Sequence, residues 1–292
     1  NRPKLIHAYD LDTVLPALLA KPFIRCKVVY DIADWYAQSR RVGRLKRLVE
    51  KIDRWVCQKV DYVIIAHEER IKQLGFQPKR LEVLYNSPPD VLKEVKSKQN
   101  KCKDYFVYVG VLQPDRGIDK IVEASKLAGT RVLIAGFGPL ADYCGKVSSE
   151  YSNIEFLGQI PYEKTLELEA NAIAILALYN PEIENNKYAA PNKLYEAMML
   201  GKSIITTKDT LVGRFVEKES IGIVIDYNSV DELAMAMNKL QKDSTLSKTM
   251  GERSRMLYDK IYSSKKQCDK LCRIYGELLA LRNASSQEEI IC

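Results

Sequence analysis

The feature that most constrains the fold is a repeated alternation of short apolar runs with longer amphipathic stretches. It extends through most of the 292 residues and is typical of a parallel sheet whose strands are connected by helices. It is interrupted where Pro88 and Pro89 precede the lysine-rich stretch 93–103, as an interdomain linker would interrupt it. The sequence therefore predicts an α/β protein with two doubly wound domains.

The two series of apolar runs predict the domain boundaries. We expect a partial N-terminal domain at 1–90, a linker at 91–104, a second domain at 105–262, and a C-terminal helix and tail at 263–292. Ligands of such sheets bind beyond the carboxyl ends of the strands. The residues after Val109, Ala135 and Leu178, each at the end of an expected strand, are therefore the first candidates for chemistry.

Composition excludes several classes of protein. No apolar run approaches the roughly 18 residues that a membrane-spanning helix needs. Apolar residues make up 46% and charged residues 28%, which is typical of a globular protein, and the net charge is +7. Seven cysteines without a Cys-x-x-Cys motif, and two histidines, argue against structural zinc and a disulfide framework. A reducing cytoplasm is the expected compartment.

A first candidate loop leaves the strand at 105–109 and enters a helix. It reads Val109-Gly110-Val111-Leu112-Gln113-Pro114-Asp115-Arg116-Gly117. Gly110 lets the backbone approach a ligand, and Gly117 opens a helix whose first N–H groups attract anions. Arg116 adds positive charge there. A plain turn with a solvated arginine fits the same residues.

A second candidate loop is Gly136-Phe137-Gly138-Pro139-Leu140-Ala141, which fits the Gly-x-Gly-x-x-Ala dinucleotide fingerprint. Glu155 lies about 20 residues further on, as the fingerprint requires. However, the loop follows the second strand of its domain, and Pro139 has no N–H to offer a pyrophosphate. We expect this loop to contact a nucleotide or to form a tight turn, rather than to bind NAD.

The third candidate is a helix that begins at Pro191, a residue that suits the first helical turn. Lys193 lies in that turn, where a cation opposes the helix dipole unless an anion is present. Glu196 lies about one turn further on nearly the same face, where it could accept hydrogen bonds from a ribose diol. The spacing of Lys193 and Glu196 also fits a surface ion pair.

Together these motifs resemble the donor domain of a known enzyme family. The helix reads P-N-K-L-Y-E-A-M-M-L-G-K-S-I-I, and it follows a V-G-V-L-x-P-D-R-G loop and an A-G-F-G turn. The chain is similar to retaining glycosyltransferases of family 4 (glycosyl transferases group 1) over roughly 1–280. His7-Ala8-Tyr9-Asp10-Leu11-Asp12 and the stretch 30–36 resemble their acceptor-side domain. The resemblance implies the GT-B fold, in which two Rossmann-like domains face a cleft.

The resemblance implies roles for three charged residues. Glu196 would hold the ribose of the nucleotide sugar, whereas Arg116 and Lys193 would neutralise the diphosphate leaving group. Helix N-termini would add to this electrostatic stabilisation, so that no metal site and no cofactor are implied beyond a UDP- or GDP-linked sugar. The remaining donor-site residues would line the nucleotide or the sugar: Gly110, Gly117, Gly136, Gly138, Tyr188, Ala190, Pro191 and Asn192.

The chain also departs from the family's pattern. Tyr188 stands where a Glu-x7-Glu motif would have its first glutamate, and Val111 stands where an arginine is common. The usual His-x-His is reduced to His7-Ala8-Tyr9, so His7 is either catalytic or a strand histidine. About 85 residues precede the linker, roughly half of a full acceptor domain, without a glycine-rich N-terminal loop. We therefore expect either a fragment or a partner chain that supplies the missing strands.

The segment Arg40–Val56 predicts a basic amphipathic helix. Its apolar stripe comprises Val42, Leu45, Leu48, Val49, Ile52, Trp55 and Val56, and its cations outnumber its acidic residues. Such a helix could contact anionic lipid, or it could pack on its own sheet with a solvated basic face. No basic patch interleaved with aromatic residues indicates a nucleic-acid partner.

The expected function is therefore hexosyl transfer with retention, to a lipid-linked or polysaccharide acceptor at the cytoplasmic face of the membrane. One alternative is a nucleotide-binding regulatory subunit that depends on a partner chain. A second is a nucleotide-sugar epimerase of the same fold, and a dehydrogenase comes last.

Overall fold

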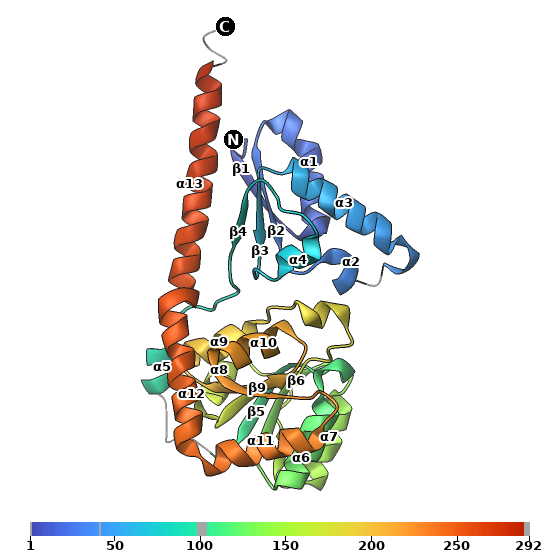
Figure 1. Ribbon diagram of the computed structural model, residues 1–292, viewed down its shortest axis with the longest axis vertical. Helices are drawn as coiled ribbons and strands as arrows, with labels where there is room; N and C mark the ends of the chain where they lie inside the picture. The colour runs from blue at the N-terminus through green and yellow to red at the C-terminus, as the bar shows by residue number, and fades with distance from the viewer. Residues whose placement is uncertain (1, 41, 98–103, 289–292) are drawn as a thin grey trace. The chain divides into compact units, whose positions relative to one another are not determined.

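The computed structural model describes residues 2–40, 42–97 and 104–288. The chain divides into two compact units, labelled by element in Figure 1. The first unit comprises Asn1–Asn86 and Lys265–Cys292, and the second comprises Ser87–Ser264. Most of the C-terminal helix therefore belongs to the unit in which the chain starts.

The first unit contains a four-stranded parallel sheet with the strand order β1-β2-β3-β4. Its strands are β1 (Leu5–Tyr9), β2 (Lys27–Ile32), β3 (Tyr62–Ile65) and β4 (Leu81–Val83). Its helices are α1 (Asp10–Ile24), α2 (Tyr36–Ser39), the 3₁₀ turn η1 (Gly43–Leu45), α3 (Lys46–Lys59), α4 (Arg70–Leu74) and α13 (Ser264–Glu288).

Successive residues of a strand point to opposite faces of a sheet, and β2 shows how this builds two cores. Val28 and Tyr30 face a core that contains Val14 of α1 and Val56 of α3. Val29, between them, faces a smaller core with Ile274 and Leu278 of α13. The first sheet is thus covered by α1 and α3 on one face and by α13 on the other.

The second unit contains a six-stranded parallel sheet with the strand order β10-β9-β8-β5-β6-β7. Its strands are β5 (Phe106–Val111), β6 (Val132–Phe137), β7 (Ile154–Phe156), β8 (Ala174–Ala177), β9 (Ser203–Thr207) and β10 (Gly222–Ile225). The direction in which strands are added reverses between β5 and β8. In open parallel sheets this reversal creates the crevice in which ligands bind.

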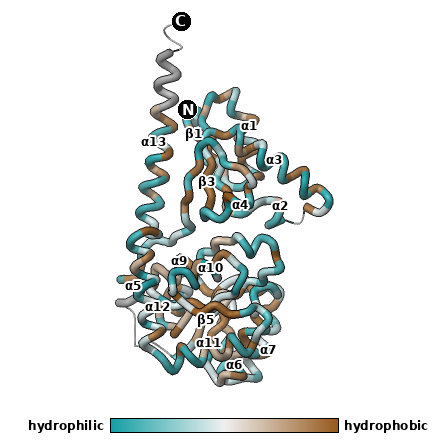
Figure 2. The backbone as a smooth tube through the Cα atoms, viewed as in Figure 1, coloured by the Kyte–Doolittle hydropathy of each residue, from teal (hydrophilic) through white to brown (hydrophobic). Residues whose placement is uncertain are grey.

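Helices cover both faces of this second sheet. They are α5 (Leu92–Ser97), α6 (Ile118–Ala128), α7 (Ala141–Glu150), α8 (Tyr162–Asn171), α9 (Asn192–Leu200), α10 (Leu211–Glu219), α11 (Val230–Lys242) and α12 (Ser244–Leu257). Short turns are η2 (Pro114–Arg116), η3 (Glu184–Lys187) and the π-helical η4 (Tyr258–Tyr262). The central strands β3 and β5 of the two units are among the most apolar segments in Figure 2.

Two helices differ from the expectation from sequence. The helix expected from residue 42 begins at Lys46, because Gly43 has a φ of +54° and only a 3₁₀ turn precedes α3. Helix α10 was not expected, although Thr210 is a recognisable N-cap whose Oγ1 accepts the Gly213 N–H at 2.9 Å. The expected linker at 91–104 includes helix α5, and its residues 98–103 lie outside the described residues.

Candidate functional site

The candidate site lies at the carboxyl ends of β5, β6 and β8, where all three predicted motifs meet. The loops after β5 and β6 pack backbone against backbone, with Gly110 paired to Gly136 in register. A Cβ on Gly136 would lie 1.8 Å from Gly110 O, and one on Gly138 would lie 2.7 Å from Leu112 O. Both residues also have a φ above +140°, so glycine is required there by the close approach of the two loops.

Arg116 lies at the end of η2, directly after the Gly110 loop. Its guanidinium lies 4.8 Å from the centre of the Tyr179 ring, and its Nε lies 3.6 Å from Asp115 Oδ2. Asn186 fixes that carboxylate by donating to Asp115 Oδ2 at 3.3 Å and to Asn180 O at 3.0 Å. Arg116 is therefore held over an aromatic ring at the mouth of the β5–β8 crevice.

Helix α9 starts beside this crevice, with Pro191 at its N-cap and no side chain capping its first N–H groups. Ala190 before it is buried, Asn192 is exposed, and Tyr188 follows the turn η3 with its N–H bonded to Asn185 O. The first turn of α9 thus has no side-chain cap, which favours an anion there.

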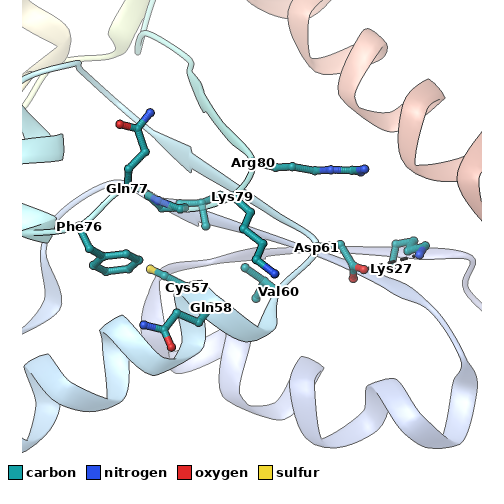
Figure 3. A pocket seen from close by; sticks show the side chains of 11 residues that line it. Lys27, Cys57, Gln58, Val60, Asp61, Phe76, Gln77, Lys79 and Arg80 are labelled. Atoms are coloured by element: carbon teal, nitrogen blue, oxygen red, sulfur yellow. Dashed lines mark ion pairs between the residues drawn. The ribbon is translucent and has the colours of Figure 1, made fainter.

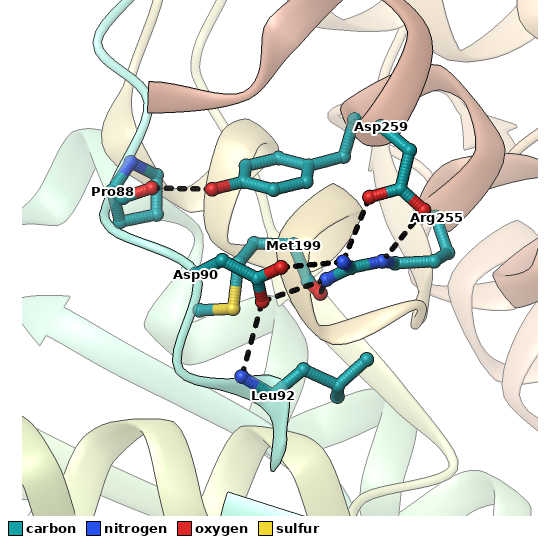
Figure 4. A network of polar contacts seen from close by, with 7 residues as sticks. Pro88, Asp90, Leu92, Met199, Arg255 and Asp259 are labelled. Atoms are coloured by element: carbon teal, nitrogen blue, oxygen red, sulfur yellow. Dashed lines mark hydrogen bonds and ion pairs between the residues drawn. The ribbon is translucent and has the colours of Figure 1, made fainter. Parts of the chain in front are cut away.

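The opposite end of α9 is tied down by Arg255, which forms the polar network of Figure 4. Arg255 Nη1 donates to Met199 O at 2.7 Å, and the guanidinium binds both oxygens of Asp90 at 2.9 and 2.5 Å. This contact with Arg255 lowers the pKa of Asp90. Tyr258 completes the network by donating to Pro88 O at 2.7 Å. Arg255 thereby anchors the helix that carries Lys193 and Glu196.

Lys193 and Glu196 form a buried ionic cluster with a third residue, Glu169 of α8. Lys193 Nζ lies 2.5 Å from Glu169 Oε1 and 3.3 Å from Glu196 Oε2. The side chains are 13%, 0% and 5% exposed for Lys193, Glu169 and Glu196. Tyr162 at the start of α8 also hydrogen-bonds Glu196 through its side chain. The alternative of a surface ion pair is therefore wrong: the pair is interior, and it includes a second carboxylate.

Burial and charge together shape the pKa values in this cluster. Burial raises the pKa of Glu169 to about 7, against the opposing effect of Lys193. Burial also lowers the pKa of Lys193, but Glu169 and Glu196 outweigh it, so the pKa of the lysine is raised. Lys193 is therefore a permanent cation whose charge is divided between two carboxylates.

Tyr179 links the cluster to Arg116. Burial raises the pKa of its phenol, and four charged side chains act on it: Arg116, Lys193, Glu196 and Glu169. Arg116 therefore lies over this ring, and Lys193 and Glu196 are close enough to act on its phenol electrostatically.

His7 belongs to the other unit, in β1. Its Nδ1 lies 2.6 Å from the Tyr275 hydroxyl of α13, and its Nε2 lies 3.1 Å from Asp31 Oδ2. Both ring nitrogens therefore have partners in this arrangement, as in a histidine that joins a strand to a helix. A catalytic role for His7 stays a prediction.

A cavity of about 550 Å³ in the first unit lies away from the predicted residues. Lys27, Asp61 and Arg80, at the amino ends of β2, β3 and β4, contribute to its lining, together with Cys57 and Phe76 (Figure 3). Ligands of parallel sheets bind at the carboxyl ends, so we assign this cavity no part in the candidate site.

Sequence reasoning missed Glu169, Tyr162 and Tyr179. A signal for Glu169 was present, because the buried face of α8 includes Thr165, Leu166, Glu169 and Ala170. An acidic residue within an apolar helical stripe needs a partner, and Lys193 in a first helical turn also needs one. Pairing these two anomalies would have found the cluster.

Two searches of the described residues found no candidates. None of the helices there combines the length and apolar character that a membrane span requires. Three or more His, Cys, Asp or Glu side chains do not gather there in an arrangement fit for a metal ion.

Comparison of sequences identifies related proteins. The sequence model of the family "Glycosyl transferases group 1" matches residues 92–256. The chain is 24% identical to the uncharacterized glycosyltransferase MJ1069 of Methanocaldococcus jannaschii, covering 92% of this chain and 73% of that protein. It is 22% identical to the O-antigen chain mannosyltransferase C of Escherichia coli, over 90% of this chain and 71% of that protein.

Comparison of structures agrees with the fold. Sucrose-phosphate synthase from Thermosynechococcus elongatus superimposes with a TM-score of 0.77 at 14% identity, covering 95% of this chain and 74% of that one. Anabaena Alr3699/HepE in complex with UDP superimposes with a TM-score of 0.73 at 15% identity, over 94% of this chain and 79% of that one. The fold is therefore that of GT-B glycosyltransferases, with two Rossmann-like domains built on parallel sheets.

Proposed function

Since the chain belongs to the family of glycosyl transferases group 1, we propose that it transfers a hexosyl group from a nucleotide-diphosphate sugar with retention at the anomeric carbon, as in family 4. The proposed acceptor is a hydroxyl of a lipid-linked or polysaccharide intermediate, so that the enzyme would serve polysaccharide biosynthesis. The observation that carries this proposal is that Arg116 lies over Tyr179 after β8, while Lys193 and Glu196 pair in the first turns of α9, which has no side-chain cap.

The geometry supports a definite orientation of the donor. Arg116 and the uncapped N–H groups at the start of α9 suit a diphosphate. Glu196, one turn further along α9, suits the hydroxyls of the ribose. A UDP- or GDP-linked sugar fits both, and Alr3699/HepE in complex with UDP-glucose is a structural neighbour. The proposal includes no cofactor and no metal ion beyond this donor.

The transfer step needs charge stabilisation on the leaving group. The bond between the anomeric carbon and the diphosphate oxygen breaks, and the electron pair stays with the diphosphate. A bond forms from the acceptor hydroxyl oxygen to the anomeric carbon, and the hydroxyl proton passes to the departing diphosphate. Arg116 and the α9 N-terminus lie where the negative charge increases, so they lower the barrier electrostatically.

The surface of α3 supports a location at the inner face of the membrane. Leu48 and Trp55 are 54% and 50% exposed, and Lys46, Arg47 and Lys51 belong to the same helix. Val49, Ile52 and Val56 instead pack on the first sheet. The predicted stripe is thus divided between packing and exposure, and its exposed part suits peripheral contact with anionic lipid. Arg41 lies outside the described residues.

A transfer assay tests the proposal. The protein is incubated with labelled UDP- and GDP-sugars and with lipid-linked acceptors, and both the released nucleoside diphosphate and the labelled product are measured. Arg116→Ala is expected to lower transfer on the order of 100-fold. Arg131→Ala is the control. Arg131 belongs to the same unit, is half-exposed, and forms an ion pair with Glu155. Equal activity of the two variants would contradict the proposed role of Arg116.

A partner-dependent subunit is the second candidate. Lys193, expected on the diphosphate, is held by Glu169 and Glu196, and Val111 stands in a position where an arginine is common. Both features reduce the positive charge available to the leaving group. Transfer that occurs only after a second chain is added would favour this candidate.

A further inference from the structure

Glu169 is a buried carboxylate that no role in ligand contact explains. Its side chain is fully buried, so a nucleotide cannot touch it. Its Oε1 binds Lys193, whereas Oε2 has no hydrogen-bond partner among the described residues. A half-satisfied buried carboxylate is unfavourable. Its presence therefore calls for an explanation in the adjacent donor site.

The ammonium of Lys193 is shared unequally between its two partners. It lies 2.5 Å from Glu169 and 3.3 Å from Glu196. Because Glu169 takes the shorter contact, Glu196 retains more of its own charge than it would in an exclusive pair. A carboxylate that retains its charge is the stronger acceptor for hydroxyl groups.

We propose that Glu169 is a positioning residue of the donor site, which acts through Lys193 to set the charge and orientation that Glu196 offers to the ribose. The role rests on the proposed function, because it assumes that Glu196 binds the nucleotide. Without the charge of Glu169, Lys193 pairs with Glu196 alone, and the ribose hydroxyls meet a neutralised carboxylate.

The surroundings of Glu169 predict how this role depends on pH. From α9 it faces Lys193 and Glu196, and Tyr162 lies on its own helix. After β8 it acts on Tyr179, and before β5 the Tyr105 hydroxyl binds Leu168 O rather than Glu169. On α5, which also packs against α8, Lys93 and Glu94 are exposed. Lys193 and Glu196 are thus the charges that act on Glu169.

Donor affinity should therefore change near neutral pH. Burial raises the pKa of Glu169 to about 7, so the carboxylate is ionised above this value and protonated below it. The ionised form leaves Glu196 charged and binds the donor tightly. The affinity is expected to rise with pH.

The experiment is calorimetric titration of the full chain with UDP-glucose and GDP-mannose from about pH 6 to about pH 8. A nucleotide sugar is used because both of its phosphates are esterified, whereas the terminal phosphate of a free diphosphate titrates in this range. Donor affinity of the wild type should rise about fivefold, the difference between a neutralised and a charged acceptor.

Three variants separate the role of Glu169 from a structural effect. Glu169→Gln should bind weakly with no pH dependence, whereas Glu163→Gln, on an exposed residue of the same helix, should keep the wild-type profile. Glu196→Gln should also lose the pH dependence, because Glu169 acts through Glu196. If Glu169→Gln fails to fold, the pH profile of Glu196→Gln tests the role of Glu169 in its place.

The outcomes distinguish two failures. If the wild type binds but shows no pH dependence, or if Glu169→Gln or Glu196→Gln keeps it, the role of Glu169 is overturned and the proposed function stands. If the wild type binds neither donor at any pH, the proposed function and this role are overturned together.

Discussion

The two units have the same kind of parallel sheet but differ in strand order. In the second unit the order reverses between β5 and β8, and all the site residues predicted from sequence except His7 lie at or after the ends of β5, β6 and β8, at or beside that reversal. In the first unit the described strands follow one another as β1-β2-β3-β4, without a reversal. Strand order alone therefore explains why the nucleotide site is expected in the second unit.

The ionic groups of the two units differ in the same way. Lys193 and its carboxylates are buried at the carboxyl edge of the second sheet, whereas Lys21 and Asp61 of the first unit remain partly exposed, at 28% and 18%. This difference is typical of a binding site compared with a surface.

The largest expected effect compares these two lysines. Lys193→Met leaves two buried carboxylates without a cation and should lower the free energy of unfolding by about 3–5 kcal/mol. Lys21→Met removes a partly exposed pair with Asp61 and should lower it by less than about 1 kcal/mol. Denaturation followed by far-UV circular dichroism measures both. Equal losses of unfolding free energy in the two variants would contradict the difference between the buried and the partly exposed ion pairs.

Two glycine-to-alanine substitutions compare a crowded loop of the second unit with an open turn of the first. Gly136→Ala would place a Cβ 1.8 Å from Gly110 O, so we expect a loss of about 3 kcal/mol or more. Gly43 also has a positive φ, but a Cβ there would meet no atom within 4 Å. Gly43→Ala should therefore lower the free energy of unfolding by about 1 kcal/mol. Both tryptophans, Trp35 and Trp55, belong to the first unit. Their fluorescence should therefore keep its transition in Gly136→Ala while the dichroism weakens.

Both units contain a fully buried carboxyl group with a raised pKa, Asp53 in the first and Glu169 in the second, and this predicts how stability changes with pH. Burial raises the pKa of Asp53, which accepts the Tyr30 hydroxyl at 2.6 Å, to about 6. The folded state therefore binds a proton that the unfolded chain releases near pH 4. Stability contributed by this proton is present below about pH 4 and is lost as pH rises to about 6.

Asp53→Asn measures this contribution. The variant should gain on the order of 2 kcal/mol relative to the wild type between about pH 4 and pH 7, as read from tryptophan fluorescence. In the second unit the pKa of Glu169 is raised to about 7, so the loss of stability with rising pH should continue to a higher pH there than in the first unit. A constant difference between Asp53→Asn and wild type across this range would contradict the assignment.

The smallest effect concerns the exposed surface of α3. Leu48→Ser should weaken binding to vesicles that contain anionic lipid by about tenfold, because an apolar side chain that would enter the interface is removed. Leu127→Ser is the matched control, since Leu127 is 62% exposed on α6 of the other unit. Similar losses in the two variants, measured by vesicle sedimentation, would argue against a specific membrane face.

Local patterns in the sequence predicted the sheets and the glycine loops well. Gly110 was expected to approach a ligand, and Gly136 and Gly138 to contact a nucleotide or form a tight turn; the structure shows that the backbone of one loop approaches the other at these glycines. Lys193 and Glu196 were predicted to be neighbours because three residues make nearly one helical turn. These inferences needed only the periodicity of one element.

Features that depend on contacts between elements were not predicted. The burial of Asp53 was not predicted: it belongs to the basic helix, but it points inward to Tyr30 of β2. Glu169 and Lys193 are 24 positions apart and lie on two different helices, so no local pattern pairs them. Helix α3 was started too early because the positive φ of Gly43 is a property of the fold, which residue types alone do not determine.

The most direct test of the central claim, that the second unit binds a nucleoside diphosphate through Glu196, is calorimetric titration with UDP, GDP, ADP and NAD. One of the three diphosphates should bind the wild type, and Glu196→Ala should weaken it about 100-fold, because a charged acceptor of the ribose hydroxyls is lost. The unfolding midpoint of the variant should fall, because Glu196 is a buried partner of Lys193, so the titration is made well below that midpoint. Equal affinity in Glu196→Ala, binding of NAD instead, or no binding by any of the four would contradict the account.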